Sequence, residues 1–155
     1  MANDIIPETE SLSKHWGGIK ALNDISLQFH DRQLHGVVGP NGAGKSSLMR
    51  TIATLQEADS GSITLGDIDV LRDKDAVRRV LGYLPQEFGV YPKVSAESML
   101  DHVAGLKGIN NRKERKELVG AMLNRVNLYD KRKNNLGTFS GGMKQRFGIA
   151  QALLG

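Results

Sequence analysis

The chain of 155 residues contains no cysteine, which excludes disulfide bonds, thiolate metal sites and cysteine nucleophiles. No apolar run approaches the roughly 18 residues that a membrane-spanning helix needs. The first ten residues carry three acidic side chains and no apolar core, so they do not resemble a secretory signal. We therefore expect a protein that is made and kept in the cytosol.

Aromatic side chains are also few, with one tryptophan, three tyrosines and four phenylalanines. The net charge of +4 arises mainly in residues 107–133, where basic side chains outnumber acidic ones. A charge run of this kind is most often a solvated helix face. So few rings are available to stack on bases that we expect no nucleic-acid partner.

The first part of the chain favours short strands. Apolar residues alternate over residues 25–30, residues 31–33 form a polar turn, and residues 34–38 are predicted to be a buried strand that leads into Gly39. A helix is expected from Gly44 to about Leu55, followed by strands at residues 62–65 and 80–84, the last of them ended by Pro85.

Three helices are predicted after Pro92. Ser95 can cap the first, residues 112–126 form the second, and residues 141–154 form the third, each with apolar residues three or four apart. The fold class is therefore α/β, with a strand-rich part at residues 1–88 and a helix-rich part at residues 89–155. We interpret these as two subdomains built around one nucleotide site.

One segment matches the pattern G-x-x-x-x-G-K-[ST] at every fixed position. Glycines let the backbone N–H groups turn inward, and the helix that starts near Gly44 adds its positive end. Lys45 can then reach the β- and γ-phosphates, and Ser46 can offer its hydroxyl to Mg²⁺. The predicted phosphate-binding residues are Gly39, Pro40, Asn41, Gly42, Ala43, Gly44, Lys45 and Ser46, with Ser47 beside them.

A phosphate loop alone does not choose among kinases, GTPases and transport ATPases. Residues 83–86 (Tyr-Leu-Pro-Gln) resemble the Q-loop of the ABC ATPase family, and residues 138–146 (Thr-Phe-Ser-Gly-Gly-Met-Lys-Gln-Arg) resemble its signature. Trp16 stands where that family carries its aromatic A-loop residue. The resemblance covers residues 12–154. It implies a P-loop NTPase fold of ABC-ATPase type, with an N-terminal antiparallel β-subdomain, a partial RecA-like core and a helical signature subdomain.

The resemblance also implies roles for single residues. Gln86 would bind Mg²⁺ and the attacking water, and would share the catalytic role with Lys45; the alternative is a polar turn residue. Trp16 would stack on adenine, where its large ring suits a purine; the alternative is a partly buried core residue. Ser140, Gly141 and Gly142 would face the γ-phosphate bound to an opposite subunit, and Ser140 would also cap its helix.

Other residues of the family pattern do not occur in these 155 residues. No Asp-Glu pair, which the family carries in its Walker B motif, is present, and all four histidines precede Ser140. The carboxylates anchor Mg²⁺ and polarise the attacking water, and a later histidine contacts the γ-phosphate. We expect that residues 1–155 alone fold poorly, or bind ATP weakly with no real turnover.

The resemblance therefore implies an ATP-binding and ATP-hydrolysing subunit of an ABC transporter, with ATP and Mg²⁺ as cofactors. Its expected partners are a transmembrane permease subunit and a second ATP-binding subunit in a head-to-tail dimer. Phe139 and Met143 replace the commoner Leu and Gln, as in the ABC-2 type exporter branch, so export is expected. The expected location is peripheral, on the inner face of the cell membrane. Two alternatives stay open: a non-catalytic nucleotide-binding fragment, and an ABC ATPase without a membrane partner.

Overall fold

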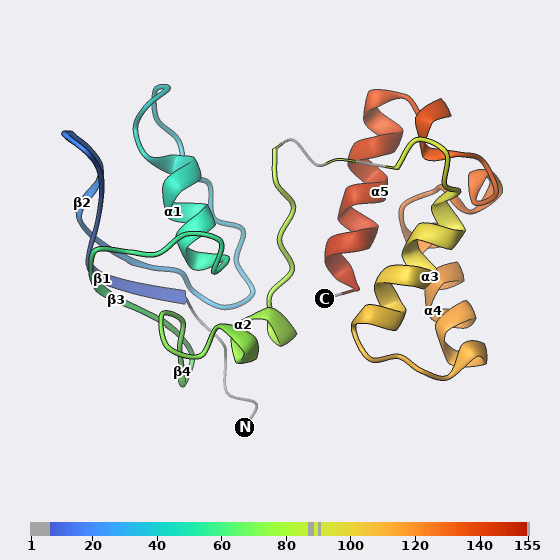
Figure 1. The fold of residues 1–155 in the computed structure, drawn as a ribbon, viewed down its shortest axis with the longest axis horizontal. Helices are drawn as coiled ribbons and strands as arrows, with labels where there is room; N and C mark the ends of the chain where they lie inside the picture. Colours follow the sequence, from blue (N-terminus) through green and yellow to red (C-terminus); the bar gives the residue numbers. More distant parts are fainter. Residues whose placement is uncertain (1–6, 87–88, 90, 155) are drawn as a thin grey trace. The chain divides into compact units, whose positions relative to one another are not determined.

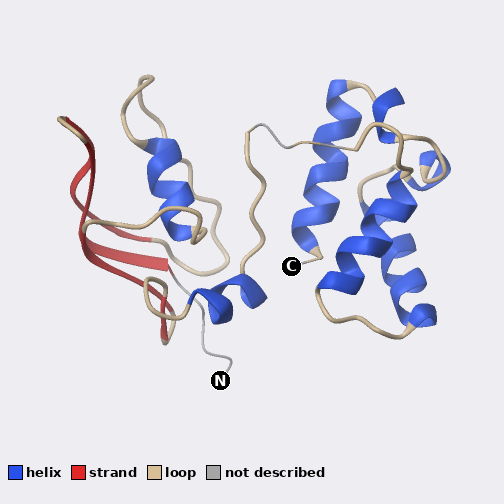
Figure 2. Cartoon of the chain, viewed as in Figure 1, coloured by secondary structure: helices blue, strands red, loops and turns tan. Residues whose placement is uncertain are grey.

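The computed structural model describes residues 7–86, 89 and 91–154. The chain divides into two compact units, Met1–Leu81 and Gly82–Gly155. Figures 1 and 2 show that the described strands all belong to the first unit and that the second is helical. The subdomain boundary near residue 88 stays a prediction, because compactness alone does not define a functional subdomain.

A four-stranded antiparallel sheet forms the frame of the first unit, in the order β2-β1-β3-β4. Its strands are β1 (Pro7–Trp16), β2 (Ile19–Gln28), β3 (Ser60–Leu65) and β4 (Ile68–Asp69). A tight turn at Gly17, where φ is +57°, joins β1 to β2 and pairs Trp16 with Ile19. The hairpin thus presents Trp16 at its end.

The register of β1 shifts between Thr9 and Leu12, and a buried side chain accommodates the irregularity. The Thr9 hydroxyl donates to the carbonyl of Ile25 at 3.1 Å and accepts from the N–H of Leu27 at 3.0 Å. A buried hydroxyl without partners would destabilise the fold, so these two bonds make the bulge tolerable.

Two helices complete the first unit, α1 (Lys45–Ile52) and α2 (Lys74–Val80). Leu48 and Ile52 of α1 belong to one buried cluster with apolar residues of the sheet. Figure 1 shows the course of both helices. Helix α1 ends three residues before the predicted Leu55, because Thr54 adopts a φ of +62° that a right-handed helix does not contain. The buried core of this unit comprises Leu12, Leu22, Leu48, Ile52, Ile63, Leu65, Val70 and Val77.

Two predicted strands are wrong. Residues 34–38 form no strand, and Leu34 and Val38 are almost fully exposed. Residues 80–84 are not a strand either, because Val80 belongs to α2 and residues 81–84 have no regular structure. An apolar, β-branched run becomes a strand only where a neighbour supplies a ladder of hydrogen bonds. No described strand lies along either segment.

The second unit confirms the predicted helices as α3 (Ala96–Leu106), α4 (Arg112–Arg125) and α5 (Gly141–Leu153). Each begins at a polar cap: the side chains of Ser95, Asn111 and Ser140 accept hydrogen bonds from N–H groups of the first turn. Two short 3₁₀ helices, η1 (Tyr129–Lys131) and η2 (Leu136–Thr138), connect α4 to α5.

The three helices of the second unit share one apolar core. Phe147 of α5 is completely buried, and its ring meets that of Phe139 edge to face, with centroids 6.5 Å apart. This contact ties the start of α5 to the core, since Phe139 directly precedes the cap residue Ser140. The remaining buried members include Leu100, Ala104, Val119, Leu123, Leu128 and Leu136.

Candidate functional site

The predicted phosphate loop forms a tight turn that leads into α1. The N–H of Ala43 donates to the carbonyl of Pro40 at 3.2 Å. Gly42 and Gly44 have φ angles of +85° and +87°, in the left-handed region that favours glycine. Gly44 is also the N-cap of α1, whose first turn carries no acidic residue. The loop therefore presents N–H groups and the positive helix end without a competing carboxylate.

Gly44 fixes the loop against the sheet. A β-carbon at this position would overlap the carbonyl oxygen of Ala21 and lie 3.2 Å from the Leu22 side chain. Both of these residues belong to β2. The requirement for glycine is thus double, since the backbone angle disfavours a side chain and the close approach excludes one.

Lys45 folds back over the loop. Its ammonium group donates to the carbonyls of Gly39 and Pro40, at 2.6 and 2.7 Å. None of the salt bridges found among the described residues involves Lys45. The cation is therefore held at the loop by neutral groups, which an anion can replace as a stronger partner.

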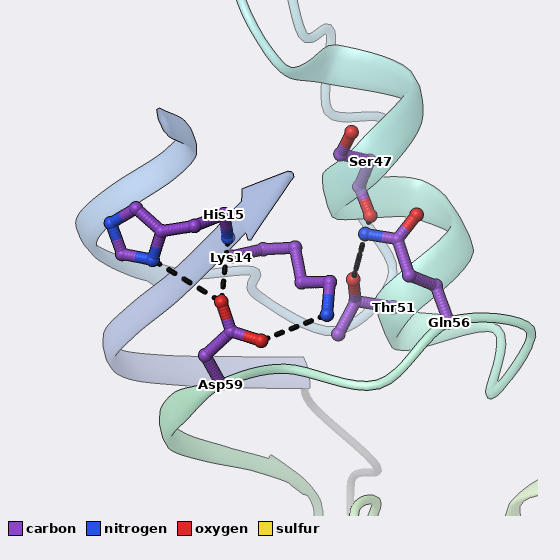
Figure 3. A network of polar contacts seen from close by, with 6 residues as sticks. All are labelled: Lys14, His15, Ser47, Thr51, Gln56 and Asp59. Carbon is purple, nitrogen blue, oxygen red and sulfur yellow. Dashed lines mark hydrogen bonds and ion pairs between the residues drawn. The ribbon is translucent and has the colours of Figure 1, made fainter. Parts of the chain in front are cut away.

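The two serines that follow Lys45 in α1 differ in exposure. Ser46 is exposed, whereas Ser47 is half-buried. The buried Thr51 hydroxyl donates to the carbonyl of Ser47 at 2.7 Å and accepts from Gln56 at 3.4 Å (Figure 3). These two hydrogen bonds satisfy the Thr51 hydroxyl, so this polar side chain can be buried.

Trp16 lies at the hairpin end with 56% of its surface exposed, so it is not a core residue. The ammonium of Lys14 lies 4.8 Å from the centroid of its ring. The same ammonium donates to Asp59 at 2.8 Å, and the other carboxylate oxygen accepts the N–H of His15 at 2.6 Å (Figure 3). The hydrogen bond from Lys14, then that from the His15 backbone, lowers the pKa of Asp59 from 3.8 to about 2.

The other predicted site residues lie in the second unit. Gln86 is exposed and has no regular structure. Ser140 is the N-cap of α5, as predicted, and its hydroxyl accepts from the N–H of Met143 at 3.2 Å. Gly141 and Gly142 begin the helix with open space where a β-carbon would point. The first turn of α5 therefore offers exposed N–H groups beside a hydroxyl.

The phosphate loop and the Trp16 hairpin lie in the same unit. Strand β2, which follows the hairpin turn, is also the strand against which Gly44 lies. Sequence reasoning missed Lys14, Asp59 and Ala21. Asp59 lies 45 residues from Lys14 along the chain, and no sequence motif signals such a pairing. Ala21 acts through its backbone oxygen, which no side-chain pattern reveals.

A glycine-rich turn at a helix start, with a lysine folded over it, defines a nucleotide-binding protein of the P-loop NTPase class. The sequence model of the family described as ABC transporter matches residues 22–155. The chain belongs to this family.

Two curated relatives and one solved structure illustrate the similarity. The uncharacterized ABC transporter ATP-binding protein YxlF of Bacillus subtilis (strain 168) is 38% identical over 145 residues, which cover 94% of this chain and 47% of the relative. The probable multidrug ABC transporter ATP-binding protein YbhF of Escherichia coli (strain K12) is 35% identical over 155 residues, covering 99% of this chain and 27% of the relative. The chain thus spans less than half the length of either relative.

The solved structure is that of the ATP-binding cassette MJ0796 in a dimeric post-hydrolysis state bound to ADP and Pi. It has a TM-score of 0.83 and 25% sequence identity, covering 96% of this chain and 69% of that one. These findings confirm the predicted P-loop NTPase fold of ABC-ATPase type. In the part of the chain that the structure describes, no helix is long and apolar enough to cross a membrane.

Proposed function

We propose that this chain is the ATP-binding part of an ABC transporter subunit, which couples ATP binding and hydrolysis to transport across a membrane. The observation that carries the proposal is the position of Lys45, whose ammonium sits on two loop carbonyls at the N-terminus of α1. A cation, a helix end and inward-facing N–H groups together bind a polyphosphate.

Each residue of the loop has a role in this proposal. Gly39, Pro40, Asn41, Gly42, Ala43 and Gly44 shape the backbone cradle, and Lys45 binds the β- and γ-phosphates. Ser47, in the first turn of α1, lies beside the α-phosphate. Trp16 supplies an exposed ring that stacks on adenine, and its position on the hairpin beside β2 supports this assignment.

The hydroxyl of Ser46 fits a magnesium ion at the same phosphates, and the family resemblance adds Gln86. Ser46 and Gln86 are exposed, and neither side chain takes part in a hydrogen bond found among the described residues. Their oxygens are the hard ligands that Mg²⁺ prefers, and we assign Ser46 and Gln86 as the residues that would hold it. When bound, Mg²⁺ neutralises charge on the β- and γ-phosphate oxygens. Gln86 would also orient the attacking water.

A second copy completes the proposed site. The exposed first turn of α5, with Ser140, Gly141 and Gly142, would face the γ-phosphate bound by the opposite copy, as in a head-to-tail dimer. The related MJ0796 cassette is a dimer bound to ADP and Pi, which supports this arrangement. The further partner would be a transmembrane permease, and the similarity to YbhF, named as a probable multidrug transporter protein, supports export. The subunit would then be peripheral on the cytoplasmic face of the membrane.

Hydrolysis needs groups that these residues do not include. The 155 residues contain no Asp-Glu pair and no histidine after Ser140. Lys45 and Gln86 alone can bind the phosphates and orient a water, but they leave it without a general base. We propose that residues 1–155 by themselves bind ATP with little or no turnover.

Equilibrium binding of ATP in the presence of Mg²⁺ tests the proposal. Lys45→Ala removes a charge-assisted contact and should weaken ATP binding by about tenfold to a hundredfold. Arg50→Ala removes an equal charge from the exposed face of the same helix and should leave affinity nearly unchanged. Unaltered ATP affinity in Lys45→Ala would refute the assignment of the loop.

A further inference from the structure

The ring of Trp16 needs a restraint to serve as a binding platform. It lies at the end of β1, is more than half exposed, and is followed by Gly17 and Gly18 in a tight turn. A side chain in such a place normally samples several rotamers, and fixing it on ligand binding reduces affinity. The contacts around the ring therefore decide how well it can bind a base.

One face of the ring is covered by a cation. The Lys14 ammonium lies 4.8 Å from the ring centroid, within the range of a cation–π interaction. The Lys14 side chain is only 13% exposed, which is unusual for lysine. The ammonium is thus enclosed between the indole and its carboxylate partner rather than free in solvent.

Asp59 holds both this cation and the backbone next to the ring. One carboxylate oxygen accepts from Lys14 at 2.8 Å, and the other accepts the N–H of His15 at 2.6 Å and faces the His15 ring nitrogen at 3.2 Å. The N–H of Asp59 itself donates to the carbonyl of Ser13 at 2.9 Å. Asp59 is therefore hydrogen-bonded to β1 on both sides of Lys14, at Ser13 and at His15. Figure 3 shows its contacts with Lys14 and His15.

We propose that Asp59 and Lys14 are positioning residues that clamp Trp16 as a one-sided platform, with Lys14 closing one ring face and the adenine of ATP stacking on the other. The inference rests on the proposed ATP-binding function. The clamp acts on the base and not on the phosphates, because none of its members is part of the phosphate loop. Its contribution is thus to affinity for the adenine end of ATP alone.

The test compares two ligands that share a phosphate chain: ATP and tripolyphosphate, which has no base, each with Mg²⁺. Trp16 is the one tryptophan of the 155 residues, so intrinsic fluorescence reports directly on its ring. We would measure dissociation constants for both ligands, the fluorescence change on binding, and quenching by acrylamide. The variants are Asp59→Asn and Lys14→Met, both near-isosteric, with Trp16→Ala as a reference.

Glu57→Gln is the matched control. Glu57 lies two residues before Asp59 and its main partner is Lys74 at 2.7 Å, so the variant removes a similar charge that no hydrogen bond joins to the clamp. We expect Asp59→Asn and Lys14→Met to weaken ATP binding by about threefold, the size of an exposed cation–π contact, and to raise acrylamide quenching. Tripolyphosphate binding should not change in either variant, and Glu57→Gln should alter neither ligand.

Two results would overturn the clamp: an equal loss of affinity for both ligands, which would mean that Asp59 supports the loop generally, or no loss for either. A different result overturns the platform itself, namely a Trp16→Ala protein whose ratio of ATP to tripolyphosphate affinity is unchanged. None of these results tests the role of Lys45. That role is tested by the dissociation constant of tripolyphosphate for Lys45→Ala. Failure of the clamp and failure of the proposed ATP site are therefore distinguishable.

Discussion

Gly44 lies directly against strand β2, where a β-carbon would overlap the carbonyl oxygen of Ala21 and lie 3.2 Å from the Leu22 side chain. A methyl group does not fit at this position. The close approach of the phosphate loop to the strand that follows the Trp16 turn therefore depends on the absence of a side chain at residue 44.

Gly44→Ala should abolish ATP binding for two reasons. The added methyl group must displace the Ala21 carbonyl, and the alanine backbone must keep a φ of +87°. Gly42→Ala is the matched control, since Gly42 has nearly the same φ, +85°, but open space around its β-carbon. Gly42→Ala should therefore lose only about 1–2 kcal/mol of stability, through backbone strain. ATP binding by calorimetry distinguishes the two, and equal losses would contradict the role of the Ala21 contact.

Ser46→Ala should weaken ATP binding in the presence of Mg²⁺ but leave binding in EDTA unchanged. The reason is that the exposed hydroxyl of Ser46 is assigned to the metal and not to the phosphates. Titration of ATP with and without Mg²⁺ measures the difference. Arg50→Ala, on the exposed face of the same helix, serves as the control, and a loss in Ser46→Ala that persists in EDTA would argue against the metal assignment.

Asp59 should make stability depend on acid pH in a defined direction. Its pKa is about 2 in the folded chain against an ordinary 3.8, chiefly because Lys14 donates to it, so the unfolded state binds the proton more tightly. The stabilising contribution is therefore complete above about pH 4 and is lost as the pH falls through 2.

Urea midpoints of the native chain and of Asp59→Asn, measured from pH 2 to pH 7, test this sign. The difference between the two proteins should be constant above pH 4 and should shrink below it. Lys14→Met should show the same loss, because it removes the main cause of the lowered pKa. A difference that grows on acidification would have the wrong sign and would refute the ion pair.

Ser140 combines two roles that substitutions can separate. As the N-cap of α5 it accepts from Met143, so Ser140→Ala should destabilise the chain by about 1 kcal/mol, whereas Ser140→Gly should lose only a few tenths. Contact with the γ-phosphate of a second copy requires the hydroxyl itself, so ATP-dependent dimerisation should suffer equally in both. Thermal unfolding and analytical ultracentrifugation measure the two effects. Dimerisation that follows stability would indicate a cap alone.

Local patterns predicted the helical elements well, because their causes are local. The spacing of Leu118 and Met122 marks the side of α4 that packs against the core, and Ser95 and Ser140 mark the starts of α3 and α5. The glycine turn that leads into α1 likewise follows a contiguous motif, whereas the binding roles of its residues stay predictions. The short helix α2 was not predicted, although Asp73 caps it, because only Val77 of its seven residues is buried.

Strands were predicted less well, because pairing is not a local property. The pattern of residues 34–38 is that of a buried strand, but no described strand lies beside it, and the segment is exposed. Conversely, β1 was not predicted, because most of its residues are polar or charged and its register shifts between Thr9 and Leu12, yet it pairs on both edges.

The sequence by itself determined the chemistry of this protein: the spacing from Gly39 to Ser46 sets a phosphate loop, and Ser140-Gly141-Gly142 sets a capped helix start. Both are contiguous and depend on backbone conformations that a few adjacent residues enforce. Only the tertiary structure decided what surrounds them. It placed Gly44 on Ala21 and set Asp59 beside Lys14 from 45 residues away, because such contacts follow from the register of a sheet and from packing, which no single segment encodes.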